Sequence, residues 1–190
     1  MSKEPGKGNM VRKILVIVAA FLFIGSNLIL AQEGQSFNAR QKAKIQAFRE
    51  EQKKEDIKFR QSIKDKLPAE KTAATIEHQN AQYASRKAFN HKIHEENMAY
   101  LRDGLIKNSK LTDAQKTEEI DFMEQQYRES VTFHDKQHSE NIAFFRKVEN
   151  DPRMTPGEKE KTLKAHFVAQ KEAAKKFFQA QQEQKKSEMK

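Results

Sequence analysis

The sequence predicts an all-α protein of four long antiparallel helices, and three observations support this. Glycine and proline number only six and four among 190 residues, whereas β-rich and α/β folds of this size need many more turn residues. Aromatic residues recur every eleven positions, or about 3.67 residues per turn, which is close to the α-helical period. Charged residues make up 33% of the chain and hydrophobic residues 36%, as is typical of long solvated helices.

Residues 1–31 have the pattern of a secretory signal peptide. A basic segment precedes an apolar run at 14–24, and Ala31 supplies a small residue for cleavage. Alternatively, the 18 residues of 14–31 form an uncleaved anchor, because this length just spans a bilayer. We therefore expect a periplasmic or secreted protein, or one anchored in the membrane by residues 14–31.

The charge of the chain suggests the kind of partner. Residues 1–31 hold four basic residues and one acidic residue, so cleavage changes the net charge from +9 to 9 − 4 + 1 = +6. For an exported protein, this excess favours acidic unfolded proteins, envelope polymers or an anionic membrane surface as partners, and not nucleic acid. The chain has no cysteine, so its stability depends on helix packing rather than on disulfides.

Proline separates the first two helices. Ser36 is a suitable N-cap for a helix to about Lys66, and Leu67-Pro68 ends it and begins a second helix that runs to about Asn108. Both helices carry an aromatic line with steps of eleven. The lines are Phe37, Phe48 and Phe59 in the first helix, and His78, Phe89 and Tyr100 in the second.

Capping boxes begin the third and fourth helices. Thr112 precedes Gln115 by three residues, and Thr155 precedes Glu158 by three, which is the spacing that satisfies two backbone donors at a helix start. The third helix is expected to extend to Glu149, ahead of a proline-containing turn.

A longer repeat of about 44 residues overlies the eleven-residue period. It relates Phe48, Phe89, Phe133 and Phe177, which are separated by 41, 44 and 44 residues. Short turns between long helices favour antiparallel neighbours. We expect a helical repeat domain over 32–178, followed by a mobile polar tail at 179–190.

The third helix carries two apolar lines that point in different directions. Such a helix contacts either two neighbours in its own chain, or one neighbour and one partner. The first line consists of Ile120, Met123, Tyr127, Val131, His134, His138, Ile142 and Phe145. The second line consists of Phe122, Phe133, Phe144 and Val148. If the third helix contacts one neighbour and one partner, the second line is the face for an unfolded client or for another copy of the chain.

Histidines form the one polar constellation. His134 and His138 are four residues apart and share a helix face, and His91 and His94 are three apart in the preceding helix. Such pairs are able to bind zinc or nickel. Alternatively, these histidines are half-buried residues at a helix interface, or they respond to pH. The chain has no nucleophile motif, phosphate-binding loop, His-Glu-x-x-His motif or cysteine pair, so nothing indicates an enzyme or an organic cofactor.

The turn Leu111-Thr112-Asp113-Ala114-Gln115 resembles the LTxxQ signature of the Spy/CpxP family of periplasmic stress proteins. Met154-Thr155-Pro156-Gly157-Glu158 is similar to a degenerate second copy. The resemblance implies a signal-bearing, all-helical and commonly dimeric protein. It also implies binding of unfolded proteins on an apolar and basic concave face, or binding of metal, as in zinc- and nickel-responsive relatives.

The function predicted from these patterns is a non-enzymatic, chaperone-like envelope protein that holds unfolded or envelope proteins and forms a homodimer. The second apolar line of the third helix is the expected client or partner face. The alternatives are a coiled-coil scaffold that self-associates through this line, and a metal-binding envelope protein that uses the histidine pairs.

Overall fold

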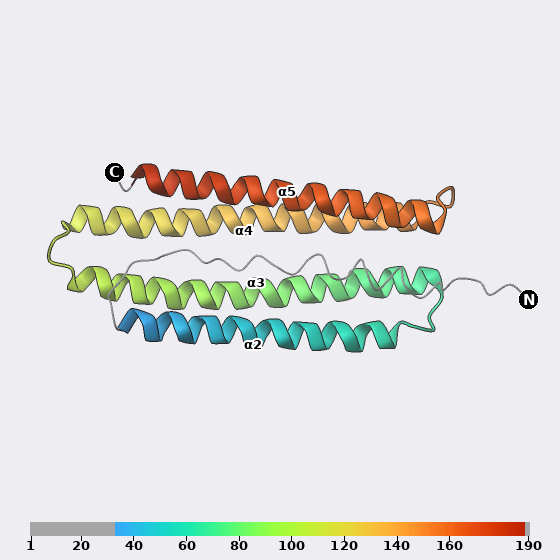
Figure 1. Cartoon of the computed structure of the whole chain (residues 1–190), viewed down its shortest axis with the longest axis horizontal. Helices are drawn as coiled ribbons and strands as arrows, with labels where there is room; N and C mark the ends of the chain where they lie inside the picture. Colours follow the sequence, from blue (N-terminus) through green and yellow to red (C-terminus); the bar gives the residue numbers. More distant parts are fainter. Residues whose placement is uncertain (1–32, 189–190) are drawn as a thin grey trace, which may run out of the picture. The chain divides into compact units, whose positions relative to one another are not determined.

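The computed structural model describes residues 33–188, with side chains from 36 to 184. It contains four helices: α2 (Glu33–Ser62), α3 (Pro68–Lys107), α4 (Asp113–Glu149) and α5 (Pro156–Glu188) (Figure 1). There is no strand among the described residues, and the all-α prediction is confirmed. The expected signal peptide or anchor at 1–31 lies outside the described residues. Within 33–188, no helix combines the length and apolar character needed to cross a bilayer.

The C-terminal helix is longer than the sequence analysis expected. α5 continues to Glu188, whereas we expected a polar tail from residue 179. The segment 179–188 contains no glycine or proline and is rich in glutamine and lysine, which are good helix formers. Gln181 is buried in this segment, so side-chain packing also continues beyond the expected end.

The starts of α3, α4 and α5 follow the capping residues, whereas α2 begins at Glu33, three residues before the expected cap Ser36. Thr112 N–H donates to Gln115 Oε1 at 2.9 Å, and Gln115 N–H donates to Thr112 Oγ1 at 3.2 Å. At the start of α3, Leu67 has no side-chain acceptor, yet its N–H still donates to Glu70 Oε2 at 3.2 Å. The residue three positions after the cap therefore returns to the cap N–H in both turns, with or without a threonine.

The start of α5 has the same geometry as that of α4. Thr155 N–H donates to Glu158 Oε2 at 2.8 Å, and Glu158 N–H donates to Thr155 Oγ1 at 3.3 Å. The Thr155 N–H and the Thr155 hydroxyl, which lies 2.7 Å from Glu158 Oε2, both donate to the Glu158 carboxylate and hold its pKa below its usual value. Pro156 occupies the first helical position, where its missing N–H is not needed.

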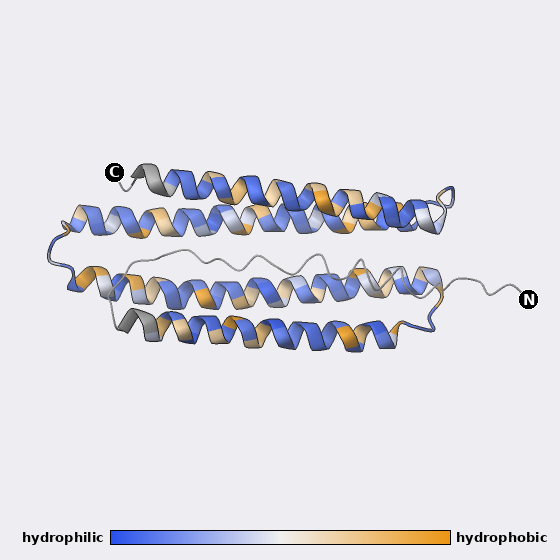
Figure 2. Ribbon diagram, in the orientation of Figure 1, coloured by the Kyte–Doolittle hydropathy of each residue, from blue (hydrophilic) through white to orange (hydrophobic). Residues whose placement is uncertain are grey.

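The chain divides into two compact units, which are described separately. The described part of the first, the α2 unit, comprises 33–65 and 77–131, and that of the second, the α5 unit, comprises 66–76 and 132–188. Along each helix most residues are hydrophilic, and hydrophobic residues occur at intervals (Figure 2).

In the α2 unit, α2 packs antiparallel to α3 through three stacked ring pairs. The ring centroids are 4.2 Å apart in Phe37–Tyr100, 4.1 Å in Phe48–Phe89 and 3.9 Å in Phe59–His78. In every pair the residue numbers add to 137, so one antiparallel register aligns all three. Rings eleven residues apart are separated by about 16.5 Å along the helix axis.

In the α5 unit, an apolar cluster joins α4 to α5. Phe145 and Val148 of α4 pack with Leu163 and Phe167 of α5, and Leu163 is fully buried. Ile76, from the first part of α3, packs against the same cluster. The α5 unit therefore contains a conventional apolar core where the end of α4 meets the first half of α5.

Candidate functional site

The second apolar line of α4 is not an open face. Phe122 and Val148 are buried, at 8% and 4% exposure. Phe133 stacks on Phe177 at 4.3 Å, and Phe144 stacks on His166 at 4.0 Å, so both rings pack against α5. The expectation of a face left entirely for a client or a second copy is therefore corrected.

The reason is that both lines of α4 have neighbours within the chain. In the α2 unit, Tyr127 of the first line stacks on His94 of α3. In the α5 unit, the second line packs on α5 through Phe133 and Phe144. This is the alternative in which a helix with two apolar lines serves two neighbours of its own chain.

Stacked ring pairs join α2 to α3 and α4 to α5. Their ten rings are all half-buried, because the rings of a pair cover each other's faces and remain partly open elsewhere. The pairs are Phe37–Tyr100, Phe48–Phe89, Phe59–His78, Phe133–Phe177 and Phe144–His166. With one face covered, these rings are not open platforms on which a sugar or a base stacks.

Polar side chains fill the spaces between the stacks of the α2 unit. Glu96 of α3 accepts hydrogen bonds from Gln41 Nε2 at 2.7 Å and from Lys44 Nζ at 2.6 Å. The hydrogen bond from Lys44 is the main cause that lowers the pKa of Glu96. Further along the same helices, Gln82 Nε2 donates to Glu55 Oε2 at 2.6 Å. The interface between α2 and α3 thus alternates aromatic and polar layers.

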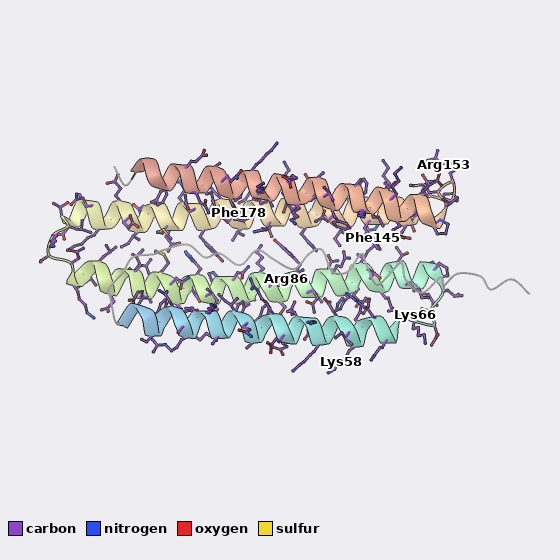
Figure 3. All side chains as sticks on the ribbon, viewed as in Figure 1. Lys58, Lys66, Arg86, Phe145, Arg153 and Phe178 are labelled. Carbon is purple, nitrogen blue, oxygen red and sulfur yellow. The ribbon has the colours of Figure 1, made fainter. Side chains whose placement is uncertain are left out.

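An acidic group lies beside the last stack of this row. Asp56 Oδ1 is 2.7 Å from His78 Nε2, and His78 stacks on Phe59. Arg86 of α3 is labelled in Figure 3. Burial lowers its pKa, while the charge of Asp56 opposes this shift. The carboxylate therefore stabilises positive charge at a half-buried position between the two helices.

The first histidine pair lies at the contact of α3 with α4. His94 stacks on Tyr127 at 3.7 Å, and its Nε2 is 3.1 Å from Glu124 Oε2. His91 Nδ1 is 3.3 Å from the hydroxyl of the same tyrosine. Burial is the first cause that raises the pKa of Tyr127, and the charges of Glu95 and Glu124 add to it.

The second pair belongs to the other unit. His134 and His138 are half-buried, and the His134 ring contacts the rings of Phe133 and Phe178. Within the described residues, no group of three or more His, Cys, Asp or Glu side chains has the geometry to hold a metal ion. His94 and His134 contact a neighbouring helix, His138 is half-buried, and His91 is exposed.

The residues of the LTxxQ-like turns act as helix caps, as described above. Comparisons of this chain with protein-family models, with curated protein sequences and with solved structures find no match. The resemblance to the Spy/CpxP family therefore remains a prediction.

Proposed function

We propose that this chain is an exported, non-enzymatic binding protein that holds apolar segments of unfolded proteins. The observation that carries this proposal is the row of three half-buried ring stacks along α2 and α3. Each ring contacts one partner ring and remains partly accessible. An apolar side chain of a client replaces that partner when the two helices separate locally.

The composition of this interface favours separation. A stacked aromatic pair contributes only about 0.5–1.5 kcal/mol beyond the burial of its surface. The buried positions between the stacks include Gln41, Gln52 and Gln82, which lose hydration without providing apolar contact. An interface of this kind opens at a lower free-energy cost than an apolar core does, and opening presents aromatic side chains at regular intervals.

The charge of the chain supports the same class of client. A net charge of +9, or +6 without residues 1–31, attracts acidic unfolded chains before any apolar contact forms. Attraction of this kind weakens with salt. Binding that depends first on charge and then on aromatic contact requires no nucleotide and no metal.

A reversible lock between α2 and α3 tests this mechanism. Gln52 Nε2 and Ser85 Oγ are 3.5 Å apart, and the chain has no native cysteine. Gln52→Cys combined with Ser85→Cys allows the two helices to be joined by oxidation or by a short bifunctional thiol reagent. Suppression of client aggregation, followed by light scattering, is expected to fall in the joined form and to return on reduction of the disulfide.

The matched control joins two positions of a single helix. Gln46 and Glu50 are hydrogen-bonded at 3.2 Å within α2, so Gln46→Cys with Glu50→Cys gives a cross-link that leaves α3 free. This variant is expected to suppress aggregation equally well before and after joining. If the α2–α3 lock retains full activity, the opening mechanism is wrong. If the unmodified chain does not suppress aggregation at all, the binding function itself is wrong.

A further inference from the structure

The exposed side of α5 carries a basic face with an apolar residue at its centre. Lys164, Val168, Lys171 and Lys175 follow one another in steps of four, three and four, which places them on one side of the helix. All four are exposed, and Val168 is 54% exposed. Within the part of the chain that the structure describes, the three lysines make no ion pair or hydrogen bond. We call these four residues the lysine face.

A different side of α5 packs on α4. Leu163, Phe167 and Ala174 are buried on a side of the helix about a quarter turn from the lysine face. α5 is therefore amphipathic in an unusual sense, since its exposed side combines positive charge with accessible apolar surface. Ala165 and Ala169 lie beside Val168 and are also exposed, so no large side chain prevents close approach to the helix.

We propose that the lysine face docks onto anionic phospholipid headgroups at a membrane surface. Three unpaired ammonium groups complement a layer of phosphates, and Val168 enters the boundary between headgroups and acyl chains. Lysine suits this position because its long aliphatic stem lies along apolar surface while the ammonium group stays with the phosphates. The one acid close to the centre of the face is Glu172, one turn from Val168.

Another exposed apolar residue shows why charge decides the partner. Ile106 of α3 is 76% exposed, but the basic side chains beside it are paired with carboxylates, Arg102 with Glu124 and Lys107 with Asp103. Mixed charge of this kind gives no net attraction to an anionic surface. The comparison also favours lipid over a soluble polyanion for the lysine face, because a polyphosphate or nucleic acid gains little from Val168 and the two alanines.

A fluorescent label at the centre of the face tests the orientation directly. The full chain has no cysteine, so Val168→Cys gives a single site for a polarity-sensitive dye. Vesicles of phosphatidylcholine with phosphatidylglycerol are expected to shift its emission to the blue, and vesicles of phosphatidylcholine alone are not. The same dye at Ile106→Cys is expected to remain unchanged with both. Docking at the lysine face is overturned if the dye at 168 does not respond, or if both positions respond equally.

Charge reversal tests the lysines themselves. Each lysine near an anionic leaflet strengthens binding roughly fivefold, so Lys164→Glu, Lys171→Glu and Lys175→Glu together should weaken vesicle binding by roughly a hundredfold. The matched control, Lys42→Glu, Lys92→Glu and Lys110→Glu, makes the same change of charge at three exposed lysines that do not share a helix face, and should have a far smaller effect. Equal losses in the two variants, or binding of polyphosphate but not of vesicles at the lysine face, contradict the proposal.

Discussion

A stack that includes histidine has a property that an all-phenylalanine stack lacks, because its ring titrates near neutral pH. His166 stacks on Phe144, and its Nε2 is 2.8 Å from Asn141 Oδ1. Burial lowers the pKa of His166 from its ordinary value of 6.5, and the charge of Glu140 partly opposes this. The folded protein therefore favours the neutral ring at this position.

This shift predicts how stability changes with pH. Because the pKa of His166 is lower in the folded chain, the unfolded chain binds more protons once the pH falls below about 6.5. The contribution of His166 to the free energy of unfolding is complete above about pH 6.5 and is lost as the pH falls towards the pKa of His166 in the folded chain. His166→Phe, which recreates the Phe133–Phe177 type of stack, should reduce the loss of stability on acidification. Urea unfolding at a series of pH values measures this, and identical pH dependence in both proteins contradicts it.

The cap of α4 provides a second test with a single residue. Thr112→Ala removes the acceptor of the Gln115 N–H and should reduce the free energy of unfolding by about 1 kcal/mol. Thr117 is the control, since its hydroxyl only donates to the Asp113 carbonyl within the helix. Thr117→Ala should change stability by less than about 0.5 kcal/mol in urea unfolding. An effect of Thr117→Ala as large as that of Thr112→Ala would show that capping is not the cause.

At the scale of helices, most boundaries could be predicted because local chemistry determines them. Pro68 and the caps at Thr112 and Thr155 correctly place the starts of α3, α4 and α5 within a residue. The end of α5 was predicted too early, because the polar composition of 179–190 suggests a mobile tail, although glutamine and lysine favour helix.

The pairing of helix faces could be predicted less well. The eleven-residue spacing shows which residues share a face, but it does not show which helix covers that face. For this reason the line from Phe122 to Val148 was expected to be open, whereas it is packed within the chain. The ring stacks were missed, although the constant sum of 137 for their residue numbers was a signal available in the sequence. The lysine face also left a signal, because Lys164 and Lys175 are eleven residues apart.

The stacks between α2 and α3 make a prediction at this scale. In a double-mutant cycle, Phe48→Leu and Phe89→Leu should show a coupling free energy of about 0.5–1.5 kcal/mol, because these two rings stack. The matched cycle of Phe48→Leu with Tyr100→Leu should show none, since Tyr100 stacks on Phe37 instead. Urea unfolding of the single and double variants gives both values. Equal coupling in the two cycles means that ring contact is not what joins the helices.

At the scale of the whole molecule, the two units differ in what stabilises them. The α5 unit contains the cluster around Leu163, while stacked rings and buried glutamines join α2 to α3 in the α2 unit. Backbone amides of α2 should therefore exchange with solvent deuterium faster than those around Leu163. Hydrogen exchange read by mass spectrometry checks this order, and equal protection of the two regions contradicts it.

Replacing the central residue of the cluster provides the corresponding variant. Leu163→Ala should lower the free energy of unfolding by about 2–5 kcal/mol, because it leaves a cavity at a fully buried position. Its largest effect on hydrogen exchange should fall in α5 and in the second half of α4. The exposed Val168 is the control, and Val168→Ala should change stability by less than about 0.5 kcal/mol.

Even spacing of the rings along α2 and α3 creates an ambiguity of alignment. If α2 slides by eleven residues, Phe37 faces Phe89 and Phe48 faces His78, so two of the three rungs of this ladder form again, about 16.5 Å out of place. The rings alone therefore do not distinguish the correct alignment from one shifted by eleven residues. The hydrogen bond from Gln41 to Glu96 is lost in that slide. The unevenly spaced polar side chains therefore select the correct alignment of the two helices.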